Sequence, residues 1–294
     1  MNPTIWFAET RPQFLVLSLI LGLLGGAVAH WCGDFSWGIS LLATAGLVAL
    51  HIAVNVFNDY FDFRSGIDLA APRTPFSGGS GLLPSGRMQA RSAFVLASIS
   101  LTAGIVAGLV LWRLTGPPVL WLGVFGVASV IGYNTFFSKI LLGEVVTGLA
   151  LGALPVLGLV YVNMLHFPPA AIYASVPSAF LVLNLLLLNE FPDAEADRAG
   201  GRRHIVTVFG PKAAAWIYVA FALGAHAWVL AGIASGIFPL TTALALLSLP
   251  VTLTACRGAL THYANPPKLV SSQAANVIVT LAFQSLLAVG FLLA

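Results

Sequence analysis

The 294-residue sequence has few charged side chains. Only 8% of its residues are Asp, Glu, Lys or Arg, whereas about 25% is usual for a soluble domain. Hydrophobic residues make up 59% of the chain, and the mean hydropathy is +0.94. This composition argues against a soluble protein and indicates a chain that lies largely within a lipid bilayer.

Cysteine is also scarce, which argues against a disulfide framework and a cysteine zinc site. Cys32 and Cys256 form no CxxC pair and have no zinc-ligand spacing, so they are interpreted as small apolar residues. The net charge is only +3, and we expect no nucleic-acid partner. The first apolar run is long and is followed by others, which argues against a cleavable signal peptide.

Long hydrophobic runs are abundant. A membrane-spanning helix needs about 20 predominantly apolar residues. Nine runs are long enough, at roughly 13–32, 37–57, 93–113, 118–137, 140–162, 170–190, 213–235, 238–256 and 274–294. The sequence therefore predicts an all-α membrane protein with nine transmembrane helices in a single bundle around a central cavity, and one domain over residues 1–294.

The basic residues are distributed unevenly between the two sides of this predicted bundle. Because consecutive connections alternate sides, twelve of the thirteen Lys and Arg residues fall on one side and only Arg113 falls on the other. Cytoplasmic loops carry an excess of Lys and Arg. We therefore expect the amino terminus to be cytoplasmic, together with two longer cap loops at about 58–92 and 191–212.

The acids gather in two places. Seven of the ten lie in "NVFNDYFDFRSGID", residues 55–68, and in "LNEFPDAEADRAGGRRH", residues 188–204. Both stretches end an even-numbered run, so both should lie at the cytoplasmic face, and ionisable groups at membrane depth are usually functional. The two stretches also resemble each other, which suggests two related halves whose acidic ends face one another.

Helical spacing places these acids on shared faces. Asn55, Asp59 and Asp62 follow an i, i+4, i+7 pattern, and Asn58 is one turn before Asp62. In the second stretch, Asn189, Asp193 and Asp197 are spaced four apart.

Carboxylates this close repel each other, and a divalent cation would compensate them. Ligands that are oxygen only favour Mg²⁺, which typically binds one or two carboxylates and substrate phosphates. Arginines follow both motifs: Arg64, Arg73, Arg87, Arg91, Arg198, Arg202 and Arg203. Acids, metal and guanidinium groups together indicate a diphosphate site, with the bilayer holding a long apolar tail.

At these residues the sequence resembles the UbiA superfamily of intramembrane prenyltransferases. The signatures are "NDYFD", Asn58 to Asp62, and "DAEAD", Asp193 to Asp197, and the likeness extends over nearly the whole chain, including the pair Arg11–Pro12. Within the superfamily, "NDYFDFRSGID", the glycine-rich "GGSGLLPSG" and "NEFPDAEADRAGGRRHIVTVFG" are most similar to the 1,4-dihydroxy-2-naphthoate prenyltransferases of menaquinone synthesis.

The resemblance implies a function. Mg²⁺ held at the two motifs would neutralise the diphosphate of an allylic polyprenyl donor, and an aromatic acceptor carbon would attack the allylic cation, with loss of CO₂ from a naphthoate. The implied catalytic residues are Asp59, Asp62, Asp193 and Asp197, and the metal ligands add Asn55, Asn58 and Asn189. We expect a multi-pass protein of the inner (cytoplasmic) cell membrane whose site opens to the cytoplasm, with no obligatory protein partner.

Further site residues are expected around these motifs. We expect Arg73 and Arg203 to clamp the diphosphate, and the other candidates to bind it are Arg64, Arg202, Tyr133 and Lys139. The family has a Tyr-x3-Lys motif, but in this sequence Lys139 lies six residues after Tyr133. Many family members have a third acid at the position of Gly66. In this chain either Asp68 takes the role of that acid, or the third acid is dispensable. Candidates for the cavity wall or the acceptor are Asp68, His51, Glu144 and His204. A buried histidine with satisfied hydrogen bonds is the commoner interpretation of His51, and Glu144 is equally compatible with a structural role.

Two alternatives stay open from the sequence. Another enzyme of the superfamily would use 4-hydroxybenzoate, homogentisate or a tetrapyrrole as acceptor, or would cyclise a terpene. A secondary transporter with intramembrane carboxylates belongs to a different class, but it would more often place them near the bilayer midplane.

Overall fold

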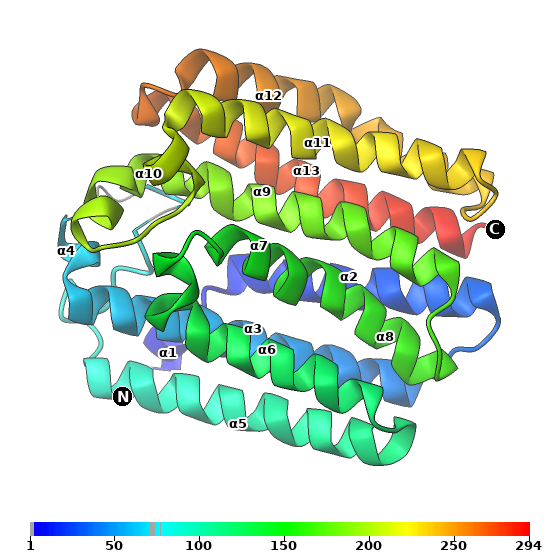
Figure 1. The fold of residues 1–294 in the computed structure, drawn as a ribbon. Helices are drawn as coiled ribbons and strands as arrows, with labels where there is room; N and C mark the ends of the chain where they lie inside the picture. The colour runs from blue at the N-terminus through cyan, green and yellow to red at the C-terminus, as the bar shows by residue number, and fades with distance from the viewer. Residues whose placement is uncertain (1–2, 71–73, 77) are drawn as a thin grey trace.

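The computed structural model describes residues 3–70, 74–76 and 78–294 (Figure 1). Over these residues it has no strand and nine helices that are long and apolar enough to cross a membrane. They are α2 (Pro12–Cys32), α3 (Trp37–Ser65), α5 (Ala90–Thr115), α6 (Pro118–Thr135), α7–η2–α8 (Gly143–Met164), α9 (Pro169–Ala199), α11 (Pro211–Ala234), η3–α12 (Leu240–His262) and α13 (Pro266–Leu292). The predicted all-α membrane fold is confirmed.

Two of these helices are longer than predicted. Helix α3 continues past the expected end at residue 57 to Ser65, and α9 continues past residue 190 to Ala199. Both acidic motifs therefore lie on helices, and the first parts of the regions 58–92 and 191–212, predicted to be cap loops, are helical. The polar final turns can be helical because they project beyond the apolar part of the span. Two related halves and a cytoplasmic amino terminus stay predictions.

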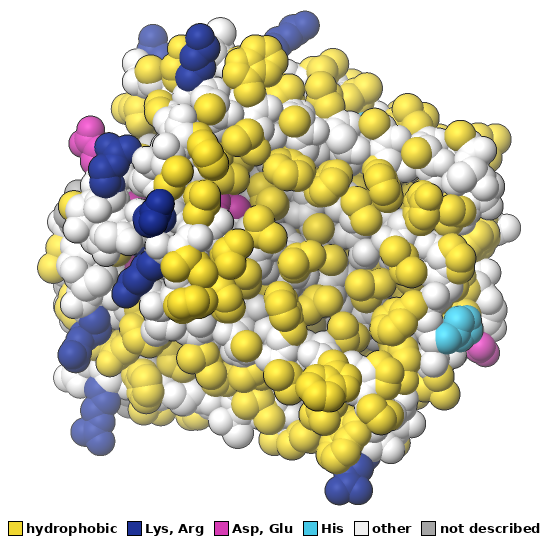
Figure 2. All heavy atoms as spheres, in the orientation of Figure 1, with side chains coloured by type: hydrophobic (Ala, Val, Ile, Leu, Met, Phe, Trp, Pro, Cys, Tyr) yellow, Lys and Arg dark blue, Asp and Glu magenta, His cyan; other side chains and the backbone are white. Residues whose placement is uncertain are grey.

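Short helices gather at one end of the bundle. Helices α4 (Ile67–Ala70) and α10 (Ile205–Phe209) lie at the same end, opposite the carboxyl terminus (Figure 1). Figure 2 shows that most of the visible Lys and Arg side chains gather at this end, while hydrophobic side chains cover much of the remaining face. We call this end the polar end; α1 (Pro3–Glu9) and η1 (Phe137–Lys139) complete the helices of the described chain.

The fifth span packs closely on the sixth through two glycines. A Cβ atom at Gly148 would lie 2.8 Å from the carbonyl oxygen of Ala179, and one at Gly152 would lie 2.7 Å from that of Ser178. Only glycine allows this approach, as is common where membrane helices pack. The contact lies where the span changes to a π-helix, Leu149–Ala153, and it keeps the start of α7 beside the polar end of α9.

Candidate active site

A cavity of about 210 Å³ lies where α3 and α9 reach the polar end. Its polar wall contains Asn55, Asn58, Asp62, Asp68, Tyr133, Asn189, Glu190, Asp193, Asp197, Arg202 and His204. Its apolar wall contains Phe14, Leu17, Val54, Leu151, Val182, Leu185 and Leu186. The two motifs, more than a hundred residues apart in the sequence, therefore share one amphiphilic cavity.

Arg202 joins the two motifs. Its Nη2 donates a hydrogen bond to Asp62 of α3 and another to Asn134 Oδ1 at 3.1 Å, while its Nη1 donates to Asp197 Oδ1 of α9 at 3.1 Å. Burial opposes the positive charge of Arg202, but the attraction of Asp62 and neighbouring groups outweighs it and raises the pKa of the guanidinium. A permanent cation is therefore held between carboxylates from both helices.

Asp59 lies under the glycine-rich segment that follows the first motif. It is 1% exposed, accepts a hydrogen bond from the Ser80 backbone N–H at 2.7 Å and forms an ion pair with Arg11 at 3.5 Å. A Cβ atom at Gly79 would lie 2.8 Å from Asp68 Oδ2 and 3.2 Å from Asp59 Oδ1, and Gly79 has a φ of +66°. Glycine is required there both for its backbone conformation and for the space that the two carboxylates occupy.

Glu9 is a member of this cluster that sequence reasoning missed. It is fully buried and accepts a hydrogen bond from Ser80 Oγ at 2.7 Å. Burial, with repulsion from Asp59, raises the pKa of Glu9 to about 8, and burial and Asp59 likewise raise the pKa of Asp68 to about 7. The available signal was weak: a single acid just before Arg11–Pro12, without helical spacing to another acid.

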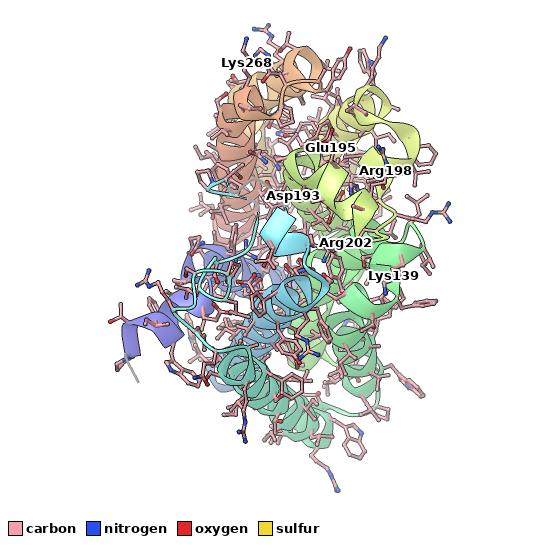
Figure 3. All side chains as sticks on the ribbon, turned by 90° about the vertical axis from the view of Figure 1, so that its left-hand side faces the viewer. Lys139, Asp193, Glu195, Arg198, Arg202 and Lys268 are labelled. Atoms are coloured by element: carbon pink, nitrogen blue, oxygen red, sulfur yellow. The ribbon has the colours of Figure 1, made fainter. Side chains whose placement is uncertain are left out.

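The structure does not bring every predicted diphosphate residue to the cavity. Tyr133 and Arg202 line it, whereas the exposed side chains of Arg64 and Lys139 line an adjacent surface cleft. Arg203 is exposed and is absent from the described lining of either cavity, and its place in a diphosphate clamp stays a prediction. Arg73 lies outside the described residues. Figure 3 looks onto the polar end, with Asp193 and Arg202 toward its middle and Lys268 at its rim.

The predicted histidines are both buried against the cavity. His51 lies deep in the wall, and its Nδ1 is 2.8 Å from Ser18 Oγ, so it is both cavity-lining and hydrogen-bonded. His204 lies between Glu190 and Asp197 and forms part of the polar wall. Glu144 is 1% exposed but does not line the described cavity; it accepts a hydrogen bond from the Ile205 backbone N–H at 2.5 Å.

The raised pKa of Glu9 predicts a pH-dependent stability. The pKa of Glu9 is about 8 in the folded state and 4.5 ordinarily, so between these pH values the folded state binds one proton more than the unfolded state. The ionisation of Glu9 therefore lowers the stability of the folded protein as pH rises through this range. Glu9→Gln removes the titration and keeps an acceptor for Ser80. In metal-free buffer, the stability of the variant relative to the wild type should rise from pH 5 to pH 8 by up to about 1.4 kcal/mol per pH unit. Above pH 8 this difference should stay constant. Parallel pH profiles of the two proteins would contradict this prediction, and the exposed Glu195→Gln is the control.

The fold and the cavity define a polytopic α-helical membrane protein with an amphiphilic, carboxylate-rich site at one end of the bundle. The chain belongs to the UbiA prenyltransferase family, whose model matches residues 18–269. This membership confirms the resemblance seen in the motifs and shows that the protein is a prenyltransferase.

Several relatives and solved structures are similar to this chain. The 1,4-dihydroxy-2-naphthoate octaprenyltransferase of Bacillus subtilis (strain 168) is 27% identical over 264 residues, covering 88% of this chain and 82% of the relative. The Escherichia coli (strain K12) protein of the same name is 29% identical over 213 residues, covering 70% of this chain and 68% of the relative.

The solved structures share the fold. An apo UbiA homologue from Aeropyrum pernix K1 aligns with a TM-score of 0.74 at 18% identity, covering 94% of this chain and 97% of that one. A UbiA homologue from Archaeoglobus fulgidus, solved with GPP and Mg²⁺, aligns with a TM-score of 0.58 at 12% identity, covering 96% of this chain and 99% of that one.

Proposed function

We propose that the protein transfers a polyprenyl group from an allylic prenyl diphosphate to 1,4-dihydroxy-2-naphthoate, giving demethylmenaquinone. The observation that carries the proposal is the bridge of Arg202 between Asp62 and Asp197, because it joins both acidic motifs in one cavity. Similarity to naphthoate octaprenyltransferases over most of the chain supports the choice of acceptor. In this proposal residues 1–294 act as one domain, with the segments 58–92 and 191–212 covering the site.

The carboxylates of this site are suited to Mg²⁺. Four carboxylates gather around the first motif: Glu9, Asp59, Asp62 and Asp68. Within the described residues, only Arg11 and Arg202 form ion pairs with this group. Such an excess of oxygen ligands fits a hard divalent cation. The residues that would hold it are Asp59, Asp62, Asp193 and Asp197, with Asn55, Asn58 and Asn189 beside them. When bound, Mg²⁺ would stabilise negative charge on the diphosphate leaving group.

The chain's own residues position the substrates. Arg202 presents its positive charge where the diphosphate would lie, while Phe14, Leu17 and Leu185 offer an apolar wall to the first part of the prenyl tail. Ser80 and Gly79 lie against Asp59, which is 1% exposed, and so keep water from this carboxylate. An allylic cation formed in this enclosure would be shielded from water until the acceptor carbon attacks it.

A panel of acceptors tests the proposal. Purified protein with Mg²⁺ and a prenyl diphosphate should prenylate 1,4-dihydroxy-2-naphthoate, with loss of CO₂ visible in the product mass. Transfer only to 4-hydroxybenzoate, homogentisate or a tetrapyrrole would keep the reaction type and overturn the acceptor. Release of diphosphate with a cyclised terpene, or no turnover of the donor at all, would overturn prenyl transfer to an aromatic acceptor.

We propose further that the protein lies in the inner (cytoplasmic) membrane and that its polar end faces the cytoplasm. In a variant with Cys32 and Cys256 replaced by alanine, Arg87→Cys should react with an impermeant thiol reagent only after the cells are opened. Asp34→Cys, in the connection at the opposite end, should react in intact cells. Both sites are exposed, so a reversed labelling pattern would show the opposite topology.

A further inference from the structure

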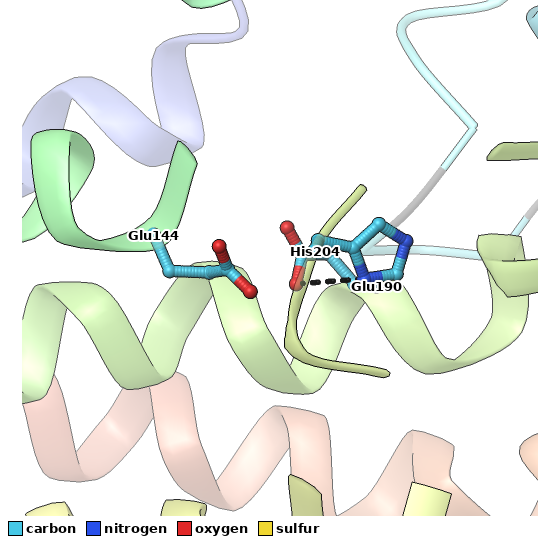
Figure 4. Close-up of side chains that lie close together, drawn as sticks. All are labelled: Glu144, Glu190 and His204. Atoms are coloured by element: carbon cyan, nitrogen blue, oxygen red, sulfur yellow. Dashed lines mark ion pairs between the residues drawn. The ribbon is translucent and has the colours of Figure 1, made fainter. Parts of the chain in front are cut away.

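Three buried side chains from separate elements meet beside the cavity (Figure 4). Glu144 lies in the first turn of α7, Glu190 lies on α9, and His204 immediately precedes α10. They are 1%, 7% and 3% exposed, and one possible ligand atom from each lies within 4.8 Å of the other two. None of the three belongs to the Asp motifs; Glu190 and His204 line the described cavity, whereas Glu144 does not.

The carboxylates of this cluster are incompletely satisfied. Glu144 Oε1 accepts the Ile205 N–H, but its Oε2 is buried, has no N–H donor among the described residues, and points toward the other two side chains (Figure 4). Glu190 Oε2 likewise has no hydrogen bond in the described part of the chain, and it forms an ion pair with His204 Nδ1 at 3.4 Å. A buried acceptor without a donor costs free energy, so each such atom calls for an explanation, such as an ion.

Both ring nitrogens of His204 face carboxylates, and neither makes a hydrogen bond within the described residues. Its Nε2 lies 3.3 Å from Asp197 Oδ2, while its Nδ1 faces Glu190. Metal-bound histidines almost always donate their second N–H to a carboxylate or another acceptor, which leaves the first nitrogen free to bind. Ligand atoms about 2.1 Å from a tetrahedral ion lie roughly 3.4 Å apart, which matches the separation between Glu190 and His204.

We propose that Glu144, Glu190 and His204 bind a divalent transition-metal cation such as Zn²⁺ or Mn²⁺, at a site separate from the one proposed for Mg²⁺. Two carboxylates neutralise the charge of the ion, and an imidazole favours such a metal over Mg²⁺. The ion would draw Glu144 toward the other two ligands and fasten α7, α9 and the turn before α10 together. Arg202 lies on that turn, two residues before His204, so the ion would also steady the bridge between the motifs.

Metal content tests this site without prenyl transfer. Full-length protein is stripped with chelator, equilibrated with Zn²⁺, desalted and measured by elemental analysis. A double variant, Asp59→Asn with Asp193→Asn, disables the site proposed for Mg²⁺ and should still retain about one equivalent of Zn²⁺. In that background, either Glu144→Gln or His204→Gln should weaken Zn²⁺ binding by more than the roughly 10- to 100-fold that is typical when a residue behind the metal ligands is lost. Glu144→Gln keeps an acceptor for the Ile205 N–H.

The matched control and a spectroscopic probe complete the test. Glu195→Gln, an exposed acid on the same helix, should retain the ion. Co²⁺ bound to the double variant should give the visible spectrum of a nitrogen-ligated ion, and His204→Gln should abolish it. The proposal is overturned if the double variant retains no Zn²⁺, if Glu144→Gln retains as much as its background, or if Co²⁺ shows oxygen ligands alone. None of these outcomes depends on whether the protein prenylates a naphthoate.

Discussion

Asp62→Asn and Asp193→Asn should each lower the rate of prenyl transfer by at least about 100-fold. Asparagine keeps the size of each side chain and removes only its charge. Asp62 and Asp193 come from different helices but line the same cavity, so each would contribute to holding the cation that offsets charge on the leaving diphosphate. Losing one preorganised electrostatic contact commonly costs two to three orders of magnitude in turnover.

Chelation should have the same effect as these substitutions. Activity of the wild type should vanish in excess chelator and return with added Mg²⁺, followed by product mass spectrometry over time. Glu195→Gln removes an exposed acid from the same helix as Asp193 and should turn over like the wild type. Full activity with chelator, or wild-type turnover in either asparagine variant, would contradict the metal assignment.

Arg202→Ala should reduce donor use by about 10- to 150-fold, whereas Arg203→Ala should change it little. Charge-assisted hydrogen bonds are worth roughly 1.5–3 kcal/mol each, and about 1.4 kcal/mol corresponds to a factor of ten. Arg202 contacts Asp62, Asn134 and Asp197, while the exposed Arg203 uses only its backbone in the described contacts. The neighbours therefore form a matched pair with equal charge and unequal environment.

A lysine at the same position sharpens this test. Arg202→Lys keeps the charge but cannot hold carboxylates of both motifs in one planar group, so it should not restore activity. The measurement is kcat/KM for short and long prenyl diphosphates, with thermal stability recorded for each variant. The loss should be similar for both donors, because the diphosphate is common to them. A larger loss in Arg203→Ala than in Arg202→Ala would contradict this prediction and favour the clamp predicted from the sequence.

The position of the acids also separates prenyl transfer from transport. A transporter would more often place its ionisable groups near the bilayer midplane. In the structure Asp62 and Asp197 lie in the last turns of their helices at the polar end, and the cavity continues into an apolar wall. This arrangement suits a substrate with a charged head and an oily tail, in agreement with the family.

The sequence by itself determined the nine spans and which faces of α3 and α9 carry the motifs. Long apolar runs can bury their backbone polar groups in a bilayer only as helices, and helical spacing then places Asp59 and Asp62 on one face. These are local consequences of residue type and order. For that reason they could be predicted without knowing how the helices pack.

Only the tertiary structure decided which neighbours complete the site. Glu9 and Gly79 reach Asp59 or its partner Ser80 through chain segments that have no helical relation to the motif. Arg202 and Arg203 are indistinguishable in sequence, but the Arg203 N–H donates to Ser138 O and its carbonyl accepts from the Leu141 N–H. Those contacts fix the turn after Gly201, whose φ is +81°, so that Arg202 points into the cavity and Arg203 toward solvent. The direction of a side chain in a turn depends on backbone angles and on distant partners, and no sequence period encodes either.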